Sequence, residues 1–155
     1  MGKNITVNSM LLSVLMPTYN VEKYIKEAIF SILTQDYSNF ELIIIDDASS
    51  DNTVSLIKEF KDNRIKFHQN DINIGVSKNR NLLLTYANGQ FISFFDSDDI
   101  SCKNRFSKQI KYLINFPKID LVFSKVKYID EYGRDIYLRK NDNVLNHTEI
   151  TSELL

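Results

Sequence analysis

Residues 91–99 read FISFFDSDD, an apolar run that ends in three carboxylates. The run has the length and hydrophobicity of a buried parallel strand. The same arrangement appears twice earlier, where LLSVLM at 11–16 meets Pro17 and FELIII at 40–45 meets two aspartates. Three apolar strands with polar ends predict a sheet whose polar residues collect at one edge.

Helical patterns lie between these strands. Apolar residues recur with helical spacing between 21 and 35, and Asn20 suits the N-cap of that helix. Ser50 or Asp51 is placed to cap the next helix. Alternating strands and helices predict an α/β fold with a mainly parallel, Rossmann-like sheet and helices on both faces. Periodicity further predicts helices at 53–61, 77–87 and 103–115, strands at 64–69 and 120–129, and a turn at 131–134.

The composition narrows the classes of function. The chain has 155 residues, 43% of them hydrophobic, which is enough for one domain. Its 19 basic and 20 acidic residues create no field that would hold nucleic acid. A single cysteine, Cys102, excludes an intramolecular disulfide framework, which favours a cytoplasmic setting. No run approaches the roughly 18 apolar residues of a membrane span, and the N-terminus lacks a secretory signal.

The strand ends are the natural place for a ligand, because parallel sheets bind ligands at the carboxyl ends of their strands. Residues 18–20, 46–47 and 96–99 each follow a predicted strand, so we expect them along one edge. Asp47 at such an edge either accepts a hydrogen bond from a nucleobase or caps the following helix. Tyr19 offers a face for stacking or for packing, and Arg80 suits a phosphate or a solvated helix face.

The carboxylates at 96–99 are the strongest chemical signal. Adjacent anions repel, so a cluster near a core needs a cation, hydrogen bonds or water to compensate it. Hard oxygen ligands at this spacing suit Mg²⁺ or Mn²⁺, which bind through one or two carboxylates and substrate phosphates. The alternative is a polar turn in which Asp98 or Asp99 caps the next helix, and the cluster alone does not decide between the two.

The order of the motifs resembles the family-2 glycosyltransferases from about Leu12 to Gly133. SVLMPTYNVEKYI at 13–25 and SILTQ at 31–35 look like that family's opening strand and helix. DDASSDNT at 46–53 resembles its DDGS(S/T)D motif, with Ala48 where glycine is usual. NIGVSKNRN at 73–81 resembles NxGVSxARN, with Asn79 in the alanine position, and DSDD resembles DxDD. RFSKQ at 105–109 and YIDEYG at 128–133 look like the segments that follow.

This resemblance implies a GT-A fold that binds a nucleotide-sugar donor. By that likeness Asp47 hydrogen-bonds the base, with uridine the commonest base, and Arg80 lies near the base or phosphates. Asp98, with Asp99 able to share the role, contacts the Mn²⁺ or Mg²⁺ that bridges the two phosphates. The nucleotide-sugar-binding residues implied by the resemblance are Pro17, Thr18, Tyr19, Asn20, Asp47, Arg80, Asp96, which would hold the ribose, and Ser97.

The resemblance also implies a reaction and a division of the chain. The reaction is inverting transfer of a sugar from a nucleoside-diphosphate-sugar, with UDP-sugar the commonest donor, to an acceptor hydroxyl in bacterial surface polysaccharide or glycoconjugate synthesis. Residues 11–140 would be the GT-A nucleotide-sugar-binding domain, after an extension or tag remnant at 1–10. Residues 141–155 would begin an acceptor-side region, and the general base would lie beyond Leu155, since no motif nominates Glu131, Glu149 or Glu153.

Three other functions share part of this pattern. A nicotinamide dehydrogenase requires GxGxxG after the first strand, where PTYN stands at 17–20. A sugar nucleotidyltransferase requires a glycine-rich loop there, and the chain has only four glycines. The open alternative is a non-catalytic nucleotide-sugar-binding module or inactive remnant. We also expect self-association through exposed apolar surface. The acceptor is a saccharide, a lipid-linked molecule or a protein, and the sequence does not identify it. The expected location is cytoplasmic, extending to the inner face of the membrane through other segments or partners.

Overall fold

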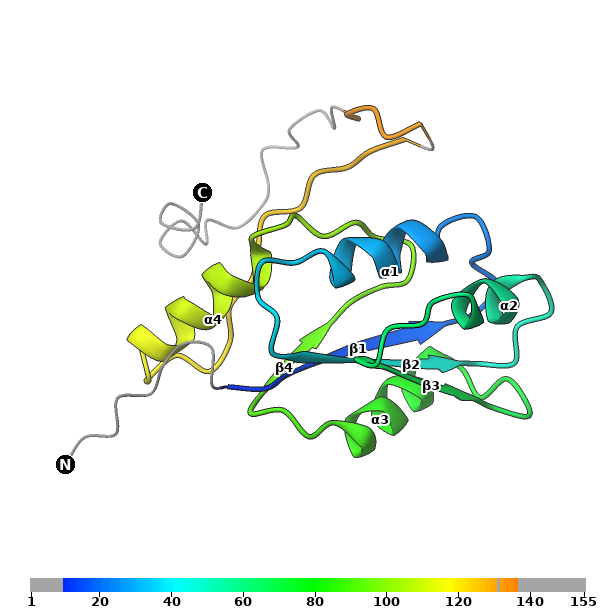
Figure 1. Ribbon diagram of the computed structural model, residues 1–155, viewed down its shortest axis with the longest axis horizontal. Helices are drawn as coiled ribbons and strands as arrows, with labels where there is room; N and C mark the ends of the chain where they lie inside the picture. Colours follow the sequence, from blue (N-terminus) through cyan, green and yellow to red (C-terminus); the bar gives the residue numbers. More distant parts are fainter. Residues whose placement is uncertain (1–9, 131, 137–155) are drawn as a thin grey trace.

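The computed structural model describes residues 10–130 and 132–136. Four strands form one all-parallel sheet in the order β3-β2-β1-β4 (Figure 1). The predicted parallel α/β architecture is therefore confirmed. The elements are β1 (Leu12–Thr18), α1 (Ile25–Leu33), β2 (Phe40–Asp46), α2 (Thr53–Lys58), β3 (Ile65–Gln69), α3 (Val76–Tyr86), β4 (Phe91–Phe94) and α4 (Arg105–Asn115).

The central strands are buried at every position, whereas every residue of the edge strands is partly or fully exposed. All seven residues of β1 and all seven of β2 are buried. β3 and β4 lie at the two edges and bury at most one side of their pleat. This contrast explains why LLSVLM and FELIII are continuous apolar runs: strands covered on both faces have no solvent side on which to place polar residues.

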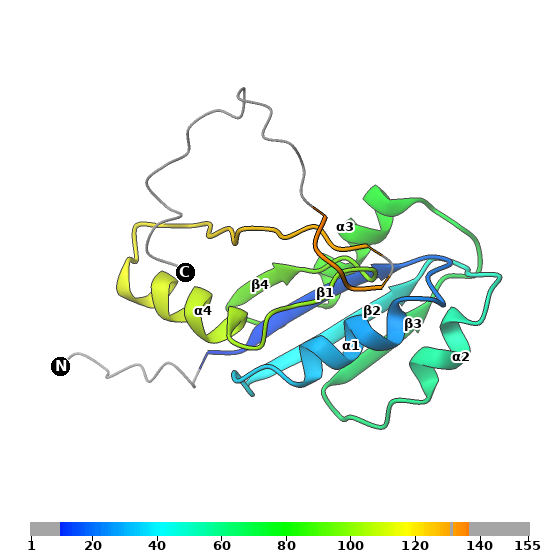
Figure 2. The same cartoon turned by 90° about the horizontal axis from the view of Figure 1, so that it is seen from above.

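Helices cover both faces of the sheet, as expected. α1, α2 and α4 pack on one face against Val14 and Met16 of β1 and their neighbours in β2 (Figure 2). α3 lies on the other face, where Leu83 packs against Leu15, Ile43 and Ile45. The apolar spacing of α1 places Ile25, Ala28, Ile29 and Ile32 in the first of these cores.

β1 continues two residues beyond the predicted end at Met16, through Pro17. The carbonyl oxygen of Leu15 accepts a hydrogen bond from Phe95 on the β4 side, and that of Thr18 accepts one from Asp47 on the β2 side. Backbone groups alternate along a strand, so the nitrogen of Pro17 faces β4. The β1–β4 ladder ends at Leu15 and Phe94, so the missing N–H of the proline leaves no ladder bond unmade.

The start of α1 differs from the prediction. The helix begins at Ile25 with Tyr24 as N-cap, after a turn at 22–24. Asn20 instead has a φ of 51°, and its Oδ1 accepts a hydrogen bond from the backbone N–H of Ser50 at 2.9 Å. Asparagine tolerates the left-handed region better than most residues. Asn20 therefore joins the loop after β1 to the loop after β2 rather than capping α1.

The predicted strand at 120–129 is wrong. Residues 119–128 have no regular structure, and only an isolated bridge joins Ile129 to Asp135. No strand of the described sheet pairs with this segment, and a strand without a ladder is not stable. The turn that follows is confirmed in its described part, with Gly133 at a φ of 75°. Residues 1–9, 131 and 137–155, which include most of the predicted N-terminal extension and the predicted acceptor-side start, lie outside the described residues.

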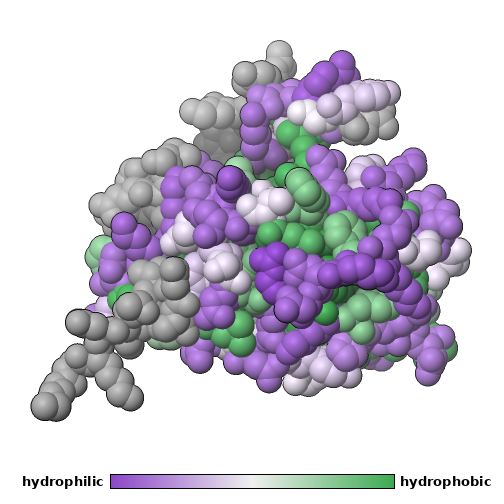
Figure 3. Space-filling model, viewed as in Figure 1, coloured by the Kyte–Doolittle hydropathy of each residue, from purple (hydrophilic) through white to green (hydrophobic). Residues whose placement is uncertain are grey.

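Apolar side chains remain at the surface around β4. Ile92 and Phe94 are 47% and 46% exposed on the face that carries α3. Further exposed apolar residues lie between 121 and 128, and hydrophobic patches interrupt the hydrophilic surface in the space-filling view (Figure 3). The self-association expected from the sequence stays a prediction, and these residues form its natural surface.

The strand order creates a switch point beside β1. The chain leaves β1 through α1 toward β2 and β3, and α3 then carries it back across β2 and β1 to β4. The loops that follow β1 and β4 therefore diverge from neighbouring strand ends. In open α/β sheets a crevice forms at such a point, outside the carboxyl ends of the strands.

Candidate functional site

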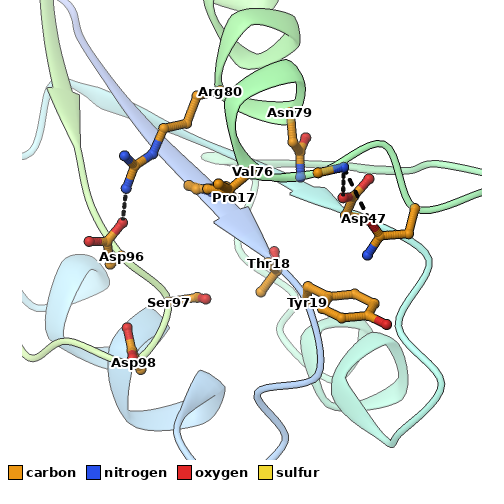
Figure 4. A pocket seen from close by; sticks show the side chains of 12 residues that line it. Pro17, Thr18, Tyr19, Asp47, Val76, Asn79, Arg80, Asp96, Ser97 and Asp98 are labelled. Atoms are coloured by element: carbon orange, nitrogen blue, oxygen red, sulfur yellow. Dashed lines mark hydrogen bonds and ion pairs between the residues drawn. The ribbon is translucent and has the colours of Figure 1, made fainter.

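A cavity of about 540 Å³ opens at this switch point (Figure 4). It lies at the carboxyl ends of β1 and β2, between the start of α3 and the loop that follows β4. Its lining combines carboxylates, amides and one aromatic ring. The lining residues are Pro17, Thr18, Tyr19, Asp47, Asn73, Gly75, Val76, Asn79, Arg80, Asp96, Ser97 and Asp98.

The structure brings together most of the residues proposed from sequence. Of the ten candidates, all but Asn20 and Asp99 line the cavity. Asn20 belongs to the inter-loop contact described above, and Asp99 lies in the same short loop as Asp98. Four other lining residues were not predicted from the sequence to bind a ligand, namely Asn73, Gly75, Val76 and Asn79. They belong to the 73–81 motif, so the signal was present but only its arginine had an obvious chemical role.

Asp47 is buried at the base of the cavity and is already hydrogen-bonded within the protein. It is 3% exposed. Its Oδ1 accepts hydrogen bonds from the side chain of Asn70 at 2.8 Å and from the N–H of Ile74 at 3.0 Å. Its Oδ2 accepts one from the N–H of Gly75 at 2.8 Å. The carboxylate thus fixes the loop that leads into α3, where Gly75 has a φ of 85° that favours glycine.

Asp46 shapes the turn beside it. Its Oδ2 accepts a hydrogen bond from the N–H of Ser49 at 2.9 Å, and its Oδ1 accepts one from the Ser49 hydroxyl. Inside this turn Ala48 has a φ of 61°. A residue with a Cβ atom is strained in the left-handed region, whereas glycine is not. The backbone therefore explains why glycine is the usual residue at this position of the resembling motif.

Arg80 and Asp96 face each other across the cavity mouth. The Nη2 atom of Arg80 lies 2.6 Å from Oδ1 of Asp96, and their side chains are 43% and 53% exposed. The pair joins α3 to the loop after β4 (Figure 4). An exposed ion pair contributes at most about 1 kcal/mol. A phosphate or hydroxyl ligand is therefore able to replace one partner at little cost.

The loop after β4 concentrates negative charge. Asp98 and Asp99 are exposed, and partial desolvation together with Asp98 and Asp96 raises the pKa of the Asp99 carboxyl. Arg105 acts in the opposite direction, and burial lowers the pKa of its own guanidinium. The cavity lining holds three carboxylates and one guanidinium, for a formal charge of −2. The site therefore lacks the positive charge that a diphosphate requires.

A divalent cation fits this donor set when a ligand completes it. Within the described residues, no group of three or more histidine, cysteine, aspartate or glutamate side chains is placed to enclose a metal. Mg²⁺ and Mn²⁺ do not need such a cage, because one or two carboxylates and substrate phosphate oxygens suffice. Asp98, at the cavity, and Asp99, in the same loop, are the carboxylates that would provide the protein ligands.

Sequence comparison assigns the family. The profile described as glycosyl transferase family 2 matches residues 13–153, which is most of the chain. The chain belongs to glycosyl transferase family 2. It is 46% identical over 104 residues to the Escherichia coli UDP-Glc:alpha-D-GlcNAc-diphosphoundecaprenol beta-1,3-glucosyltransferase WfgD, covering 67% of this chain and 41% of that enzyme. The chain thus spans about two fifths of this curated relative.

Solved family 2 structures share the fold. The structure of S. aureus TarS (residues 1–349) in complex with UDP-GlcNAc superposes with a TM-score of 0.64 and 36% identity, covering 68% of this chain and 32% of that one. The mannosyltransferase PcManGT from Pyrobaculum calidifontis, in complex with GDP-Man and Mn²⁺, gives a TM-score of 0.63 at 25% identity, covering 78% and 37%. The sheet described above is therefore of the GT-A type. In the described part of this family 2 chain, no helix is long and apolar enough to cross a membrane.

Proposed function

We propose that this family 2 chain is the donor-binding part of a metal-dependent, inverting glycosyltransferase that uses a nucleoside-diphosphate-sugar. The observation that carries the proposal is the cavity at the switch point, where Tyr19, Arg80 and the aspartates after β4 meet around one space. Residues 11–140 would form the donor-binding unit. Deprotonation of the acceptor hydroxyl, which inversion requires, is assigned to residues outside this unit.

The negative charge of the cavity lining supports the proposal that a metal ion binds there. A nucleoside diphosphate brings at least two negative charges to a lining whose formal charge is already −2. Arg80 is the one cation among the lining residues, and its charge is already included in this total. Binding of the diphosphate to this surface therefore needs a divalent cation. When bound, Mn²⁺ or Mg²⁺ supplies Lewis-acid stabilisation of the charge on the leaving diphosphate.

Each residue then has a distinct task. Asp98, with Asp99 beside it, holds the metal, and Asp96 accepts a hydrogen bond from the ribose. Once Asp96 turns to the ribose, Arg80 is free for the phosphates. This exchange costs little because the Arg80–Asp96 pair is half exposed. Ser97 is buried within the loop and lines the cavity between the two aspartates.

The base is assigned to the side of the cavity formed by Tyr19 and Asp47. The ring of Tyr19 is 48% exposed at the cavity edge, which leaves a face free for stacking. The Asp47 carboxylate accepts three hydrogen bonds from N–H groups. Among the described residues, only Gly75 donates to its Oδ2. Oδ2 therefore retains a lone pair for an N–H of the base. We infer uridine, since TarS is crystallised with UDP and with UDP-GlcNAc.

We further infer a role in bacterial surface polysaccharide or glycoconjugate synthesis. The relatives whose names state an activity include the E. coli glucosyltransferase above and the S. aureus poly(ribitol-phosphate) beta-N-acetylglucosaminyltransferase TarS. Both names describe sugar transfer to a larger phosphate-containing acceptor. We place this chain on the cytoplasmic side of the membrane, together with its nucleotide-sugar donor.

Thermal unfolding with different nucleotides and metals tests the proposal. The chain is melted with UDP, GDP, TDP or ADP, each with Mn²⁺, Mg²⁺ or EDTA. A ligand at a hundredfold excess over its dissociation constant adds about 2.7 kcal/mol of stability. We expect a rise in midpoint with UDP that EDTA removes and that Asp98→Ala also removes. A cooperative transition that no nucleotide shifts would contradict the donor site and favour the inactive remnant.

A further inference from the structure

Two segments that resemble family motifs lie away from the cavity but meet each other. Residues 31–35 cover the end of α1 at Leu33 and the two residues after it, and residues 105–106 begin α4 on the same face of the sheet (Figure 1). None of these residues lines the cavity. Their contact is made through the side chain of Gln35, which is 7% exposed. The position of this side chain in the fold therefore indicates a role outside direct ligand contact.

The Gln35 amide holds the segment that follows the β4 loop. Its Nε2 donates hydrogen bonds to the carbonyl oxygen of Cys102 at 2.8 Å and to the hydroxyl of Ser101 at 3.2 Å. It also lies 3.0 Å from the carbonyl oxygen of Ser31 in the last turn of α1. Its Oε1 accepts a hydrogen bond from the N–H of Phe106 at 3.2 Å. One buried amide thus fixes residues on both sides of the start of α4.

Two neighbours of Gln35 strengthen the same contact. The hydroxyl of Ser31 accepts a hydrogen bond from the N–H of Ser101 at 3.0 Å. The N–H of Asp36 donates to the carbonyl oxygen of Lys103 at 3.0 Å. Every one of these bonds ends on the stretch 101–106. The C-terminal turn of α1 therefore serves as a clamp on the residues immediately after Asp99.

The clamp holds the C-terminal end of a very short loop. On the other side, the N–H of Phe95 donates to the carbonyl oxygen of Leu15 at 3.0 Å. Residues 96–100 span the interval between Phe95 and Ser101 and carry three carboxylates. Carboxylates this close in the chain repel one another, and this repulsion favours an open loop. The clamp and the Phe95 bond resist this opening without touching the ligand.

We propose that Gln35 is a positioning residue for metal binding: by clamping residues 101–106, it holds the Asp96–Asp99 loop in the shape that binds the cation. The proposal rests on the proposed function, because it assigns the cation to that loop. Residues that orient metal ligands from outside the coordination sphere typically affect metal affinity by about 10- to 100-fold when changed. Gln35 differs from such residues in that it acts through the backbone of the loop.

The test uses Gln35→Leu, which keeps the size of the side chain and removes its hydrogen bonds. Ser31→Ala is the milder variant, because it leaves the Gln35 amide in place. It removes the bond from Ser101 and the bond that the Ser31 hydroxyl donates to the carbonyl oxygen of Ala28 within α1. Ile57→Ala is the matched control, since Ile57 is 2% exposed in the same core but lies on α2, away from the loop. The void left by the smaller alanine side chain lowers the free energy of unfolding, and it does not reach residues 96–106.

Two quantities are measured on all variants under conditions where circular dichroism shows them folded. The first is the affinity for Mn²⁺ in the presence of UDP, from the electron paramagnetic resonance signal of free Mn²⁺. The second is hydrogen exchange at the amides of residues 96–102. We expect Gln35→Leu to weaken Mn²⁺ binding about 10-fold and to accelerate exchange in this loop. Ser31→Ala should have a smaller effect in the same direction.

The outcomes separate the two proposals. Unchanged Mn²⁺ affinity in Gln35→Leu, or a loss no greater than in Ile57→Ala, overturns the role of Gln35 and leaves the proposed function standing. If the wild-type chain binds UDP but no Mn²⁺, the metal assignment itself fails, and with it the positioning role. Weaker Mn²⁺ binding with faster loop exchange, both absent from the control, supports Gln35 as the positioning residue.

Discussion

The aspartates at the end of β2 and the aspartates after β4 look alike in sequence but have different surroundings. We call them the β2 aspartates (Asp46, Asp47 and Asp51) and the β4 aspartates (Asp96, Asp98 and Asp99). The β2 aspartates accept hydrogen bonds from backbone and side-chain donors of their own and neighbouring loops. The β4 aspartates are exposed, and Asp96 has the one ion pair. The first set builds the cavity, and the second remains available to a ligand.

The difference follows from the strands that carry the two sets. β2 is central, so the loop after it is enclosed by the loops after β1 and β3, whose N–H groups reach its carboxylates. β4 is at the edge of the described sheet, so the loop after it meets fewer donors. A buried carboxylate is tolerated only where such donors compensate it. The same residue type is therefore hydrogen-bonded within the fold in one loop and exposed in the other.

The largest expected effect is on the free energy of unfolding, and it distinguishes the β2 aspartates from the β4 aspartates. Asp47→Ala leaves the N–H group of Ile74 and the side-chain amide of Asn70 without their acceptor, and leaves the N–H of Gly75 with Asn73 Oδ1 alone. A buried donor without a partner costs about 1–3 kcal/mol, so we expect a loss of about 3 kcal/mol in the free energy of unfolding measured with urea. A loss below about 1 kcal/mol would show that water replaces the carboxylate and would weaken the comparison.

Asp51 provides the next effect and a dependence on pH. Its carboxylate accepts hydrogen bonds from the N–H groups of Thr53 and Glu22. Burial raises its pKa, but the bonds from Thr53 and Glu22 outweigh burial and hold the pKa below its usual range. The N-cap of α2 is Asn52 rather than the predicted Ser50 or Asp51. Asp51→Ala should nevertheless cost about 1–2 kcal/mol near neutral pH, because two N–H groups lose their charged acceptor.

The stabilisation from Asp51 should be present above its unfolded pKa of about 3.9 and should disappear as the pH falls through the lower folded value. Urea unfolding of wild type and Asp51→Ala from pH 7 downward therefore gives converging stabilities at acid pH. A constant difference between the two proteins across this range would assign the effect of Asp51 to packing rather than to its charge.

Ala48 allows a change in the stabilising direction. Its φ of 61° is costly for a residue with a Cβ atom and is not costly for glycine. Part of the gain is offset by the greater backbone entropy of glycine in the unfolded chain. We expect Ala48→Gly to raise the free energy of unfolding by about 0.5–1 kcal/mol, and the midpoint of thermal unfolding with it. A lower midpoint would argue against the left-handed conformation at this turn.

The smallest effect on stability belongs to the β4 aspartates. Asp98 is exposed and lies among other carboxylates, so Asp98→Ala should change the free energy of unfolding by no more than about 0.5 kcal/mol. The same substitution should remove the shift caused by UDP with Mn²⁺. A large loss of stability without ligand would place Asp98 with the β2 aspartates and end the distinction between the two sets.

The sequence was sufficient for the sheet and for most of the cavity. Continuous apolar runs predicted the buried strands, and the rule that parallel strands share one polar edge brought residues 18, 47 and 96 together. The failed strand at 120–129 shows the limit of this approach. Its apolar residues predict a strand, but a strand also needs a partner, and a local pattern does not reveal whether a partner edge is near.

The hydrogen-bonding state of the aspartates was also beyond the sequence. Asp47 and Asp98 each follow another acidic or polar residue after an apolar strand, and local pattern treats them alike. They differ because residues 70–75 donate hydrogen bonds to the Asp47 carboxylate. This segment lies more than twenty residues away from Asp47 in the chain. The contacts of Gln35 were not predicted for a related reason. Its hydrogen-bond partners at 101–106 follow β4 in the sequence and lie far from Gln35 along the chain.

The strand order has a consequence for how the molecule folds. β1 pairs with β2 across a short crossover, but its pairing with β4 joins Leu12 to Phe91, most of the described chain later. Closing a longer loop costs more entropy and slows formation of the contact. We therefore expect β1, β2 and β3 to assemble first and β4 to dock last. The cavity does not exist until that docking, so the binding site is the final part of this fold to appear.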